Sequence, residues 1–344
     1  MDIPPSAAPV EPAVTTVVGT TGIDDPDAAV VIDGATKRFG DDIAVDDISL
    51  VVRTGTILGI IGPSGSGKTT TIRLLTGALA PSEGEVRVLG EDPRYFHRRT
   101  RERIGYMPQQ FTLYADLTAR ENVDFVASLF GMLWRKRHRR TREVLELVDL
   151  WEARGRRAGR LSGGMQRRLE LASALVHDPD LMFLDEPTAG IDPLLRAKVW
   201  EELHRLRDAG RTLLVTTQYV NEAESCDTVA LISGGRLIAL APPEDLRREA
   251  MGGDIVEITT TEPVDTTGLT NLPMIRRIDR RGPNELRVTV DDAATAMPDV
   301  VDAITRNGGD VASASEARPS FDEVFAILVE RDRGVRGTDS GEAA

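Results

Sequence analysis

The chain has 344 residues, enough for about two domains with hydrophobic cores, and its formal net charge at pH 7 is -13. This acidic balance disfavours nucleic acid as the main partner, because binding phosphate backbones requires a basic face. The single cysteine, Cys226, excludes a disulfide framework within the chain and suits a reducing cytoplasm.

The hydropathy of the chain and its N-terminal segment argue against a membrane-spanning helix and against a secretion signal. No apolar run approaches the ~18 residues that a membrane-spanning helix needs, and the N-terminus lacks a charged-then-apolar secretion signal. Residues 1–27 are rich in Pro, Ala, Thr and Asp without periodicity, which predicts a disordered N-terminal tail. If the protein works at a membrane, we expect it on the cytosolic side, with another chain spanning the bilayer.

Short strands broken by turns follow the tail, and we expect strands at 30–35, 48–52 and 85–89 in an antiparallel subdomain. Phe39 stands in an otherwise polar turn between the first two strands. An isolated aromatic of this kind is most often part of the core, and the alternative is stacking on an adenine ring.

A glycine-rich loop follows the apolar run 56–61 and precedes a helical pattern. It fits G-x-x-x-x-G-K-[ST], a phosphate-binding loop whose glycines let backbone N–H groups wrap a polyphosphate at the positive end of the next helix. Lys68 would then reach the β and γ phosphates, and the Thr69 hydroxyl would ligate Mg²⁺. The loop residues are Gly62, Pro63, Ser64, Gly65, Ser66, Gly67, Lys68, Thr69 and Thr70.

The region after residue 93 is basic and then helical. A short strand at 104–107 ends before Gln109, and Thr118 with Glu121 forms a capping box that opens an amphipathic helix to about residue 133. The run 135–140 is Arg-Lys-Arg-His-Arg-Arg. Such a run is most often a solvated helix face, and the alternative is proximity to anionic lipid.

A Ser-Gly-Gly segment, Ser162, Gly163 and Gly164, lies at the start of the next helix, 167–175. It presents N–H groups, a hydroxyl and the positive end of a helix dipole, which suits an anion but also suits an ordinary N-cap. The motif by itself leaves both interpretations open.

The apolar strand 180–184 ends in two acids, Asp185 and Glu186. A second buried strand that ends in carboxylates downstream of a phosphate loop is what a Mg²⁺-nucleotide site requires, with Asp185 on the metal side and Glu186 as base for the attacking water. After a turn at 189–192, a helix from Pro193 to residue 208 precedes a third buried strand, 211–217, which ends at Gln218. Strands that alternate with helices predict a parallel sheet with its ligands at the carboxyl ends of the strands.

The character of the chain changes after residue 241. A short helix at 244–249, strands at 254–260, 274–278 and 285–290, a helix at about 297–305, a strand near Val311 and a last helix from a capping box at Ser320 and Glu323 are expected. No catalytic constellation occurs here. This part is therefore predicted to be a small α+β module for dimer contact or regulation.

Residues 29–241 resemble the ATP-binding subunit of ABC transporters, because several motifs stand in that family's order and spacing. The phosphate loop matches Walker A, Gln109 the Q-loop, residues 161–166 the LSGGQ-type signature, residues 181–186 Walker B with its catalytic Glu, and 189–192 the D-loop. Phe39 matches the aromatic A-loop position. Met165 in place of Gln, Gln218 in place of the usual switch His, and the tail 319–323 look most like daunorubicin-resistance-type ATPases of drug exporters.

The resemblance implies an α/β P-loop NTPase fold with a parallel sheet, an antiparallel β subdomain, an α-helical subdomain and a small α+β C-terminal domain. The expected divisions are a disordered tail at 1–27, the ATP-binding domain at 28–243 with its helical subdomain at about 93–175, the accessory domain at 244–331 and a disordered tail at 332–344. The implied cofactors are ATP and Mg²⁺.

The resemblance also implies roles for single residues. Glu186, Lys68, Gln218 and Gln109 would be catalytic, Thr69, Gln109 and Asp185 would hold the metal, and Phe39, the phosphate loop and Ser162, Gly163 and Gly164 would bind nucleotide. Glutamine can donate a hydrogen bond to a γ-phosphate oxygen but cannot carry a proton as histidine does. We therefore expect Gln218 to position the phosphate and Glu186 to be the base.

In the family, two subunits meet head to tail, so that each signature covers the nucleotide of the other. The leading hypothesis is an exporter ATPase on the cytoplasmic side of the membrane, which pairs with a second copy and a separate permease contacted near 109–116. A soluble ABC ATPase that acts on ribosomes or DNA is the alternative, although this chain shows one nucleotide site and no sustained heptads. A non-hydrolysing nucleotide-gated module is a third, against which Asp185 and Glu186 argue.

Overall fold

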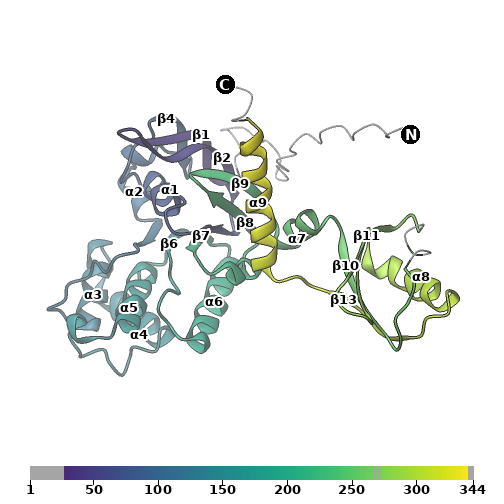
Figure 1. Ribbon diagram of the computed structural model, residues 1–344. Helices are drawn as coiled ribbons and strands as arrows, with labels where there is room; N and C mark the ends of the chain where they lie inside the picture. Colours follow the sequence, from purple (N-terminus) through teal and green to yellow (C-terminus); the bar gives the residue numbers. More distant parts are fainter. Residues whose placement is uncertain (1–26, 267–268, 270–271, 340–344) are drawn as a thin grey trace.

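The computed structural model describes residues 27–266, 269 and 272–339, and the expected tail at 1–27 therefore lies almost wholly outside the described residues. Three sheets organise the chain (Figure 1). A six-stranded sheet has the order β5-β6-β7-β3-β8-β9, a three-stranded antiparallel sheet the order β2-β1-β4, and a four-stranded antiparallel sheet the order β11-β12-β10-β13.

The six-stranded sheet is parallel from β5 to β8, and β9 closes it antiparallel to β8. This confirms the predicted parallel sheet. Its strands are β3 Ile57–Ile61, β5 Ile104–Met107, β6 Leu181–Asp185, β7 Thr212–Thr217, β8 Thr228–Ser233 and β9 Arg236–Ala241.

The antiparallel subdomain is also present, with longer strands than the sequence predicts. The reason is that β1 and β2 form one hairpin that continues through polar residues up to Phe39 and Asp42. The strands are β1 Ala28–Phe39, β2 Asp42–Arg53 and β4 Glu83–Val88.

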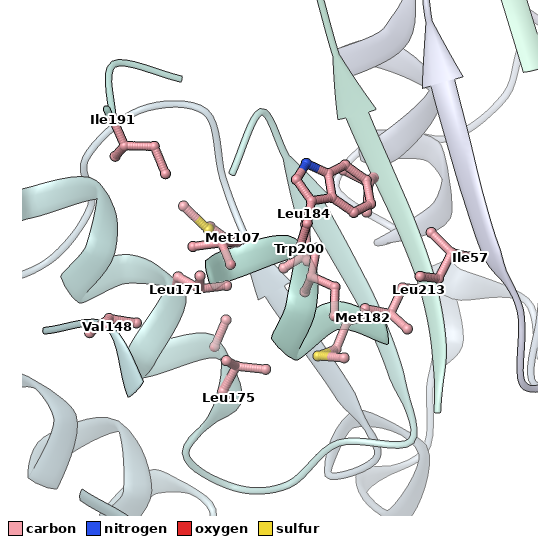
Figure 2. Packing of buried hydrophobic residues seen from close by; sticks show 14 of the residues in the cluster. Ile57, Met107, Val148, Leu171, Leu175, Met182, Leu184, Ile191, Trp200 and Leu213 are labelled. Carbon is pink, nitrogen blue, oxygen red and sulfur yellow. The ribbon is translucent and has the colours of Figure 1, made fainter. Parts of the chain in front are cut away.

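Both faces of the parallel sheet are covered, as parallel sheets require. Alternate residues of a strand point to opposite faces, so Leu184 of β6 packs in the cluster of Trp200 and Leu171, whereas Phe183 packs with the antiparallel sheet and α1. Figure 2 shows the first cluster, where side chains from β3, β6 and β7 meet those of the helices.

Three helices of the main domain, α3, α4 and α5, pack against one another in a separate lobe. The capping box at Thr118 and Glu121, which opens α3, is present as predicted. α3 ends four residues earlier than expected because Gly131, in the left-handed region at φ 67, turns the chain. The helices are α1 Lys68–Leu75, α2 Arg98–Arg101, α3 Ala119–Leu129, α4 Trp134–Leu147, α5 Gly163–Leu175 and α6 Pro193–Asp208, with short 3₁₀ turns η1 Pro93–Tyr95, η2 Ala158–Arg160 and η3 Val220–Ser225.

The C-terminal module has its own core. Val256, Val288 and Val300 belong to a cluster separate from those of the main domain. Its helix α8 begins at Ala293, earlier than predicted, because Asp292 caps it and Pro298 is accommodated in its first turns. The elements are α7 Pro243–Met251, which joins the module to the main domain, β10 Asp254–Thr260, β11 Ile275–Arg280, β12 Glu285–Val290, α8 Ala293–Arg306 and β13 Val311–Ala317.

The last helix, α9 Phe321–Asp339, lies outside the apolar core of that module, although Glu323 pairs with Arg287 of β12 at 3.0 Å. Phe321, Val324 and Leu328 lie in the same core cluster as Ala223 of η3 and Leu246 of α7, and Figure 1 shows α9 running beside β8 and β9. From the sequence we expect this helix to belong to the domain at 244–331 and a disordered tail to begin at residue 332. The helix instead packs against the main domain and continues to Asp339. The sequence could not predict this, because an apolar face indicates that a helix is buried but not which surface covers it.

Candidate functional site

The phosphate loop lies between β3 and α1. Gly67 caps α1 at φ 105 and gives no side-chain cap, so the first N–H groups of the helix have no side-chain acceptor at that cap. Gly62 must lack a side chain, because a Cβ there would stand 2.1 Å from the carbonyl oxygen of Ile232. The loop therefore offers backbone donors in a cradle that glycines keep open.

The Lys68 side chain is folded into this loop. Its Nζ donates to the carbonyl oxygens of Gly62 at 2.8 Å and Pro63 at 3.0 Å, and the residue is only 5% exposed. Burial lowers the pKa of Lys68, and the nearby carboxylates Glu186 and Asp185 oppose that effect. The hydroxyl of Ser66 is buried without a hydrogen-bond partner among the described residues. Both groups are donors that an anion in the cradle would engage.

Asp185 ends β6 and is fully buried. Its Oδ1 accepts hydrogen bonds from the hydroxyls of Thr69, at 3.4 Å, and Thr216, whereas Oδ2 is buried and has no partner in the described part of the chain. An unpaired buried carboxylate oxygen is costly unless a cation or donor meets it. Together, the Asp185 carboxylate and the Thr69 hydroxyl are oxygen ligands that fit Mg²⁺.

No cluster of three or more His, Cys, Asp or Glu side chains suited to a metal exists among the described residues. Mg²⁺ in nucleotide sites is usually held by one or two protein oxygens, substrate phosphates and water. The sparse donor set at Asp185 and Thr69 therefore fits a metal that arrives with a nucleotide.

Glu186 follows directly and has a left-handed backbone, at φ 53. Its N–H donates to the Thr216 carbonyl at 3.1 Å and to the Thr216 hydroxyl at 3.0 Å, while its own carbonyl accepts from Arg167. A non-glycine residue in this region costs about 1–3 kcal/mol and is common at functional sites. β7 and Arg167 thus fix the carboxylate-bearing residue at the end of β6.

Gln218 and Gln109 are exposed residues just beyond the carboxyl ends of β7 and β5. β7 lies between β3 and β6 in the sheet. Lys68 comes after β3, Asp185 ends β6 and Gln218 comes directly after β7, so all three stand on the side of the sheet where the parallel strands end. Gln109 follows β5, at the end of the sheet next to β6.

Phe39 ends β1 and is 47% exposed, with Lys37 Nζ 5.3 Å from its ring centroid. The β1–β2 hairpin that carries it contacts the loop, because the carbonyl of Ala44 approaches the Cα of Gly67 so closely that a Cβ there would be 2.4 Å away. The ring thus belongs to the sheet that covers the phosphate loop.

Ser162 caps α5 by accepting from the Met165 N–H at 3.4 Å, and Gly163 begins the helix. Figure 1 shows α5 with α3 and α4 in the lobe below the sheet, whereas α1 lies near β2 and β4. In the described chain no hydrogen bond joins this segment to the phosphate loop. The loop, Asp185, Glu186 and Gln218 thus stand at the carboxyl ends of three adjacent strands, whereas Ser162, Gly163 and Gly164 belong to the start of α5 in the other lobe.

Sequence reasoning missed Arg167, which is 8% exposed. Its guanidinium donates to the carbonyls of Asp185, Glu186, Pro108 and Gln109 and pairs with Glu170 at 2.9 Å. It therefore links the end of β6 to the segment after β5. The signal available was an Arg and a Glu three residues apart on a helix otherwise expected to be buried, since buried charges need partners.

A second buried connection was also missed. Glu222 in η3 accepts from the Thr188 hydroxyl at 2.7 Å and lies 3.6 Å from Arg196 of α6, whose guanidinium stands 4.2 Å from the Tyr219 ring centroid. The buried Thr188–Glu222 hydrogen bond thus joins the segment after Gln218 to the segment after Glu186. Nothing in the local pattern around Glu222 indicates it, because its partners are more than twenty residues away.

Comparison with known proteins places these motifs in a family context. Residues 45–189 match the family model of ABC transporters, and residues 242–329 match that of the C-terminal domain of DrrA1-3-like ATP-binding proteins. The daunorubicin resistance ATP-binding protein DrrA3 of Streptomyces coeruleorubidus is 36% identical over 315 residues, covering 90% of this chain and 98% of that protein. The Nod factor export ATP-binding protein I of Rhizobium sp. (strain N33) is 36% identical over 305 residues, covering 88% of this chain and 98% of that protein.

Among solved structures, a dimeric ATP-binding cassette in a post-hydrolysis state with ADP and Pi is similar, with a TM-score of 0.58 and 28% identity. That match covers 62% of this chain and 98% of the other.

Proposed function

This chain belongs to the family of ABC transporter ATP-binding subunits, and from that premise we infer that it hydrolyses ATP to drive export of drug-like or hydrophobic compounds through a separate membrane permease. The observation that supports the site assignment is the convergence of Lys68, Asp185 and Gln218 at the ends of three adjacent parallel strands. A triphosphate at that edge would meet the loop donors on one side and the carboxylates on the other.

We assign the nucleotide site to the loop 62–70, with Phe39 stacking on the base. Mg²⁺ would be held by the Thr69 hydroxyl and Asp185, with Gln109 reaching it from the end of β5, and it would neutralise charge on the phosphates. The unpaired Oδ2 of Asp185 supports this assignment.

Within this site Lys68 stabilises negative charge on the transferring phosphoryl group, and Glu186 accepts the proton of the attacking water. Gln218 positions the γ-phosphate through its amide N–H. The anchored backbone of Glu186 supports its role, because a base must be held within hydrogen-bond reach of its proton.

Replacing Gln218 by Glu should lower ATP hydrolysis about 10–100-fold, because it removes a hydrogen bond to a charged group, with a contribution of about 1.5–3 kcal/mol, and adds a repelling carboxylate. Steady-state ATPase rates of the purified chain measure this. The control is Gln110→Glu, which adds a carboxylate at an exposed amide in the segment after β5, two strands away from Gln218, and should keep the parental rate. A parental rate for Gln218→Glu would refute the positioning role.

The active unit is a head-to-tail pair of this chain, in which Ser162, Gly163 and Gly164 of one copy cover the γ-phosphate bound by the other. This is supported by the separation of α5 from the phosphate loop within one chain and by the dimeric relative. Ser162 and Ser64 are both exposed, as a contact between copies requires.

A protein with Ser64→Cys and Ser162→Cys should form an intermolecular disulfide when ATP is present and hydrolysis is blocked by Glu186→Gln. The native thiol will not compete, because Cys226 is buried and burial raises its pKa. Non-reducing electrophoresis detects the crosslinked dimer, and each single-cysteine variant is the control. If no dimer forms with ATP, the proposed pair is wrong.

The permease would dock near residues 109–116, between the nucleotide edge and the α3–α5 lobe, and it would hold this chain at the cytoplasmic side of the membrane. None of the helices in the described part of the chain has both the length and the hydropathy of a membrane span. Cell fractionation separates the alternatives, since permease-dependent recovery with membranes supports export and co-sedimentation with ribosomes supports the soluble ABC ATPase.

A further inference from the structure

The junction of α3 and α4 exposes three large apolar side chains within six residues. Leu129 is 67% exposed, Leu133 80% and Trp134 70%. Single exposed apolar residues are normal, but a group of three including Trp is a feature of interaction surfaces. We call residues 129–137 the α3–α4 tip.

The same tip is strongly basic in an acidic protein. From residue 125 to residue 142 the sequence contains six Lys or Arg and no Asp or Glu, against a net charge of -13 for the chain. The ion pairs of α4 begin further along, with Arg139 and Glu143. In the described part of the chain no carboxylate lies within ion-pair distance of Arg135, Lys136 or Arg137.

The chemistry of the tip fits one kind of surface. Trp is enriched at the level of lipid headgroups, and apolar side chains next to Lys and Arg are the pattern of segments that lie on anionic membranes. Each juxtamembrane Lys or Arg strengthens binding to anionic lipid about fivefold. A nucleic acid would engage the cations but leave Leu133 and Leu129 in water.

The two most exposed apolar side chains of the tip, Leu133 and Trp134, lie outside the cavity of this lobe, which favours a lipid surface over a peptide held in that cavity. The cavity in this lobe is lined by residues that include Tyr106 of β5, Val126 of α3 and Phe130 at the start of the tip, whereas neither Leu133 nor Trp134 lines it. In a lipid headgroup layer the apolar side chains of the tip would leave water, and its cationic side chains would meet lipid phosphates.

We propose that the α3–α4 tip binds the surface of a membrane rich in anionic phospholipid, with Leu133 and Trp134 at headgroup level and Arg135, Lys136 and Arg137 on the lipid phosphates. The proposal rests on the proposed function in that it places the chain at a membrane. It adds a lipid contact that is separate from the permease.

The test is co-sedimentation of the purified full chain with vesicles of phosphatidylcholine alone or mixed with phosphatidylglycerol, without any permease. Binding is expected to anionic vesicles only, and to weaken as salt is raised because salt screens exposed charges. The triple variant Arg135→Ser, Lys136→Ser, Arg137→Ser should bind about 100-fold more weakly, at about fivefold per cation. Trp134→Ala should lose the vesicle-induced blue shift of tryptophan fluorescence.

The matched control is Arg98→Ser, Arg99→Ser, Arg101→Ser in α2, which removes the same charge from another exposed basic segment and should leave vesicle binding nearly unchanged. Equal binding of the tip variant and the parent, or equal binding to neutral vesicles, would overturn the proposal. Binding only to membranes that contain the permease would assign the tip to the permease instead. Because the Ser64–Ser162 crosslink and the ATPase rate are measured without vesicles, they would fail separately if the proposed function itself were wrong.

Discussion

Replacing Glu186 by Gln is expected to lower the rate of ATP hydrolysis about 10²–10⁴-fold while ATP binding remains. The substitution removes the base but keeps the size of the side chain. It also leaves the backbone anchored, since the N–H of residue 186 still donates to Thr216 and its carbonyl still accepts from Arg167. Phosphate release measures the rate, and binding of a fluorescent ATP analogue measures affinity.

The control for Glu186→Gln is Glu201→Gln, which removes a carboxylate that pairs with Arg205 on the exposed face of α6. The Glu201→Gln protein should hydrolyse ATP at the parental rate. The Glu186→Gln protein should also accumulate as an ATP-bound dimer, because closure no longer leads to hydrolysis. Hydrolysis at the parental rate would remove Glu186 from the role of base.

Lys68→Ala is expected to weaken ATP binding about 10–100-fold, since hydrogen bonds to charged groups contribute about 1.5–3 kcal/mol. Hydrolysis should fall by a further factor of about 10²–10³, as when one preorganised donor to a developing charge is removed. In this structure the Lys68 ammonium is buried against Gly62 and Pro63 carbonyls, near Asp185 and Glu186. A triphosphate that replaced those carbonyls would therefore pair with an ammonium group that is already shielded from water, where the attraction between opposite charges is stronger.

Lys198→Ala is the control for Lys68, because Lys198 is exposed and its Nζ lies 3.0 Å from Asp149 on the surface. It should bind and hydrolyse ATP like the parent. The two substitutions separate two roles, since Glu186→Gln keeps ATP binding and Lys68→Ala weakens it. If the Lys68→Ala protein held and split ATP normally, the phosphate loop would not be the nucleotide site.

The strands and most helices were predictable because their patterns are local. The loop at 62–70 carries its own evidence of phosphate binding, since glycines, Lys68 and Thr69 must be contiguous to wrap a phosphate. β10 and β12 begin and end where alternation predicts, and α6 begins at Pro193 as expected. Boundaries failed where a cap or a left-handed turn decided them, as at Asp292 and Gly131.

The connections between segments were not predictable. In the sequence, Arg167 is one of two adjacent arginines of a helix and Glu222 is one of several nearby acids, so nothing local predicts what either side chain is buried against. Their burial against Asp185 and Glu186, and against Thr188, depends on strands that are distant in the sequence.

The amino-acid sequence predicts a phosphate-binding loop at 62–70 and two carboxylates at the end of a later strand, because each motif needs only residues that are neighbours in the chain. Tertiary structure alone decided that α9 packs against the main domain, with Phe321, Val324 and Leu328 in the same core cluster as Ala223 and Leu246. The physical reason is that apolar periodicity specifies that a face is buried, whereas the partner surface is chosen by long-range packing, which no local pattern encodes.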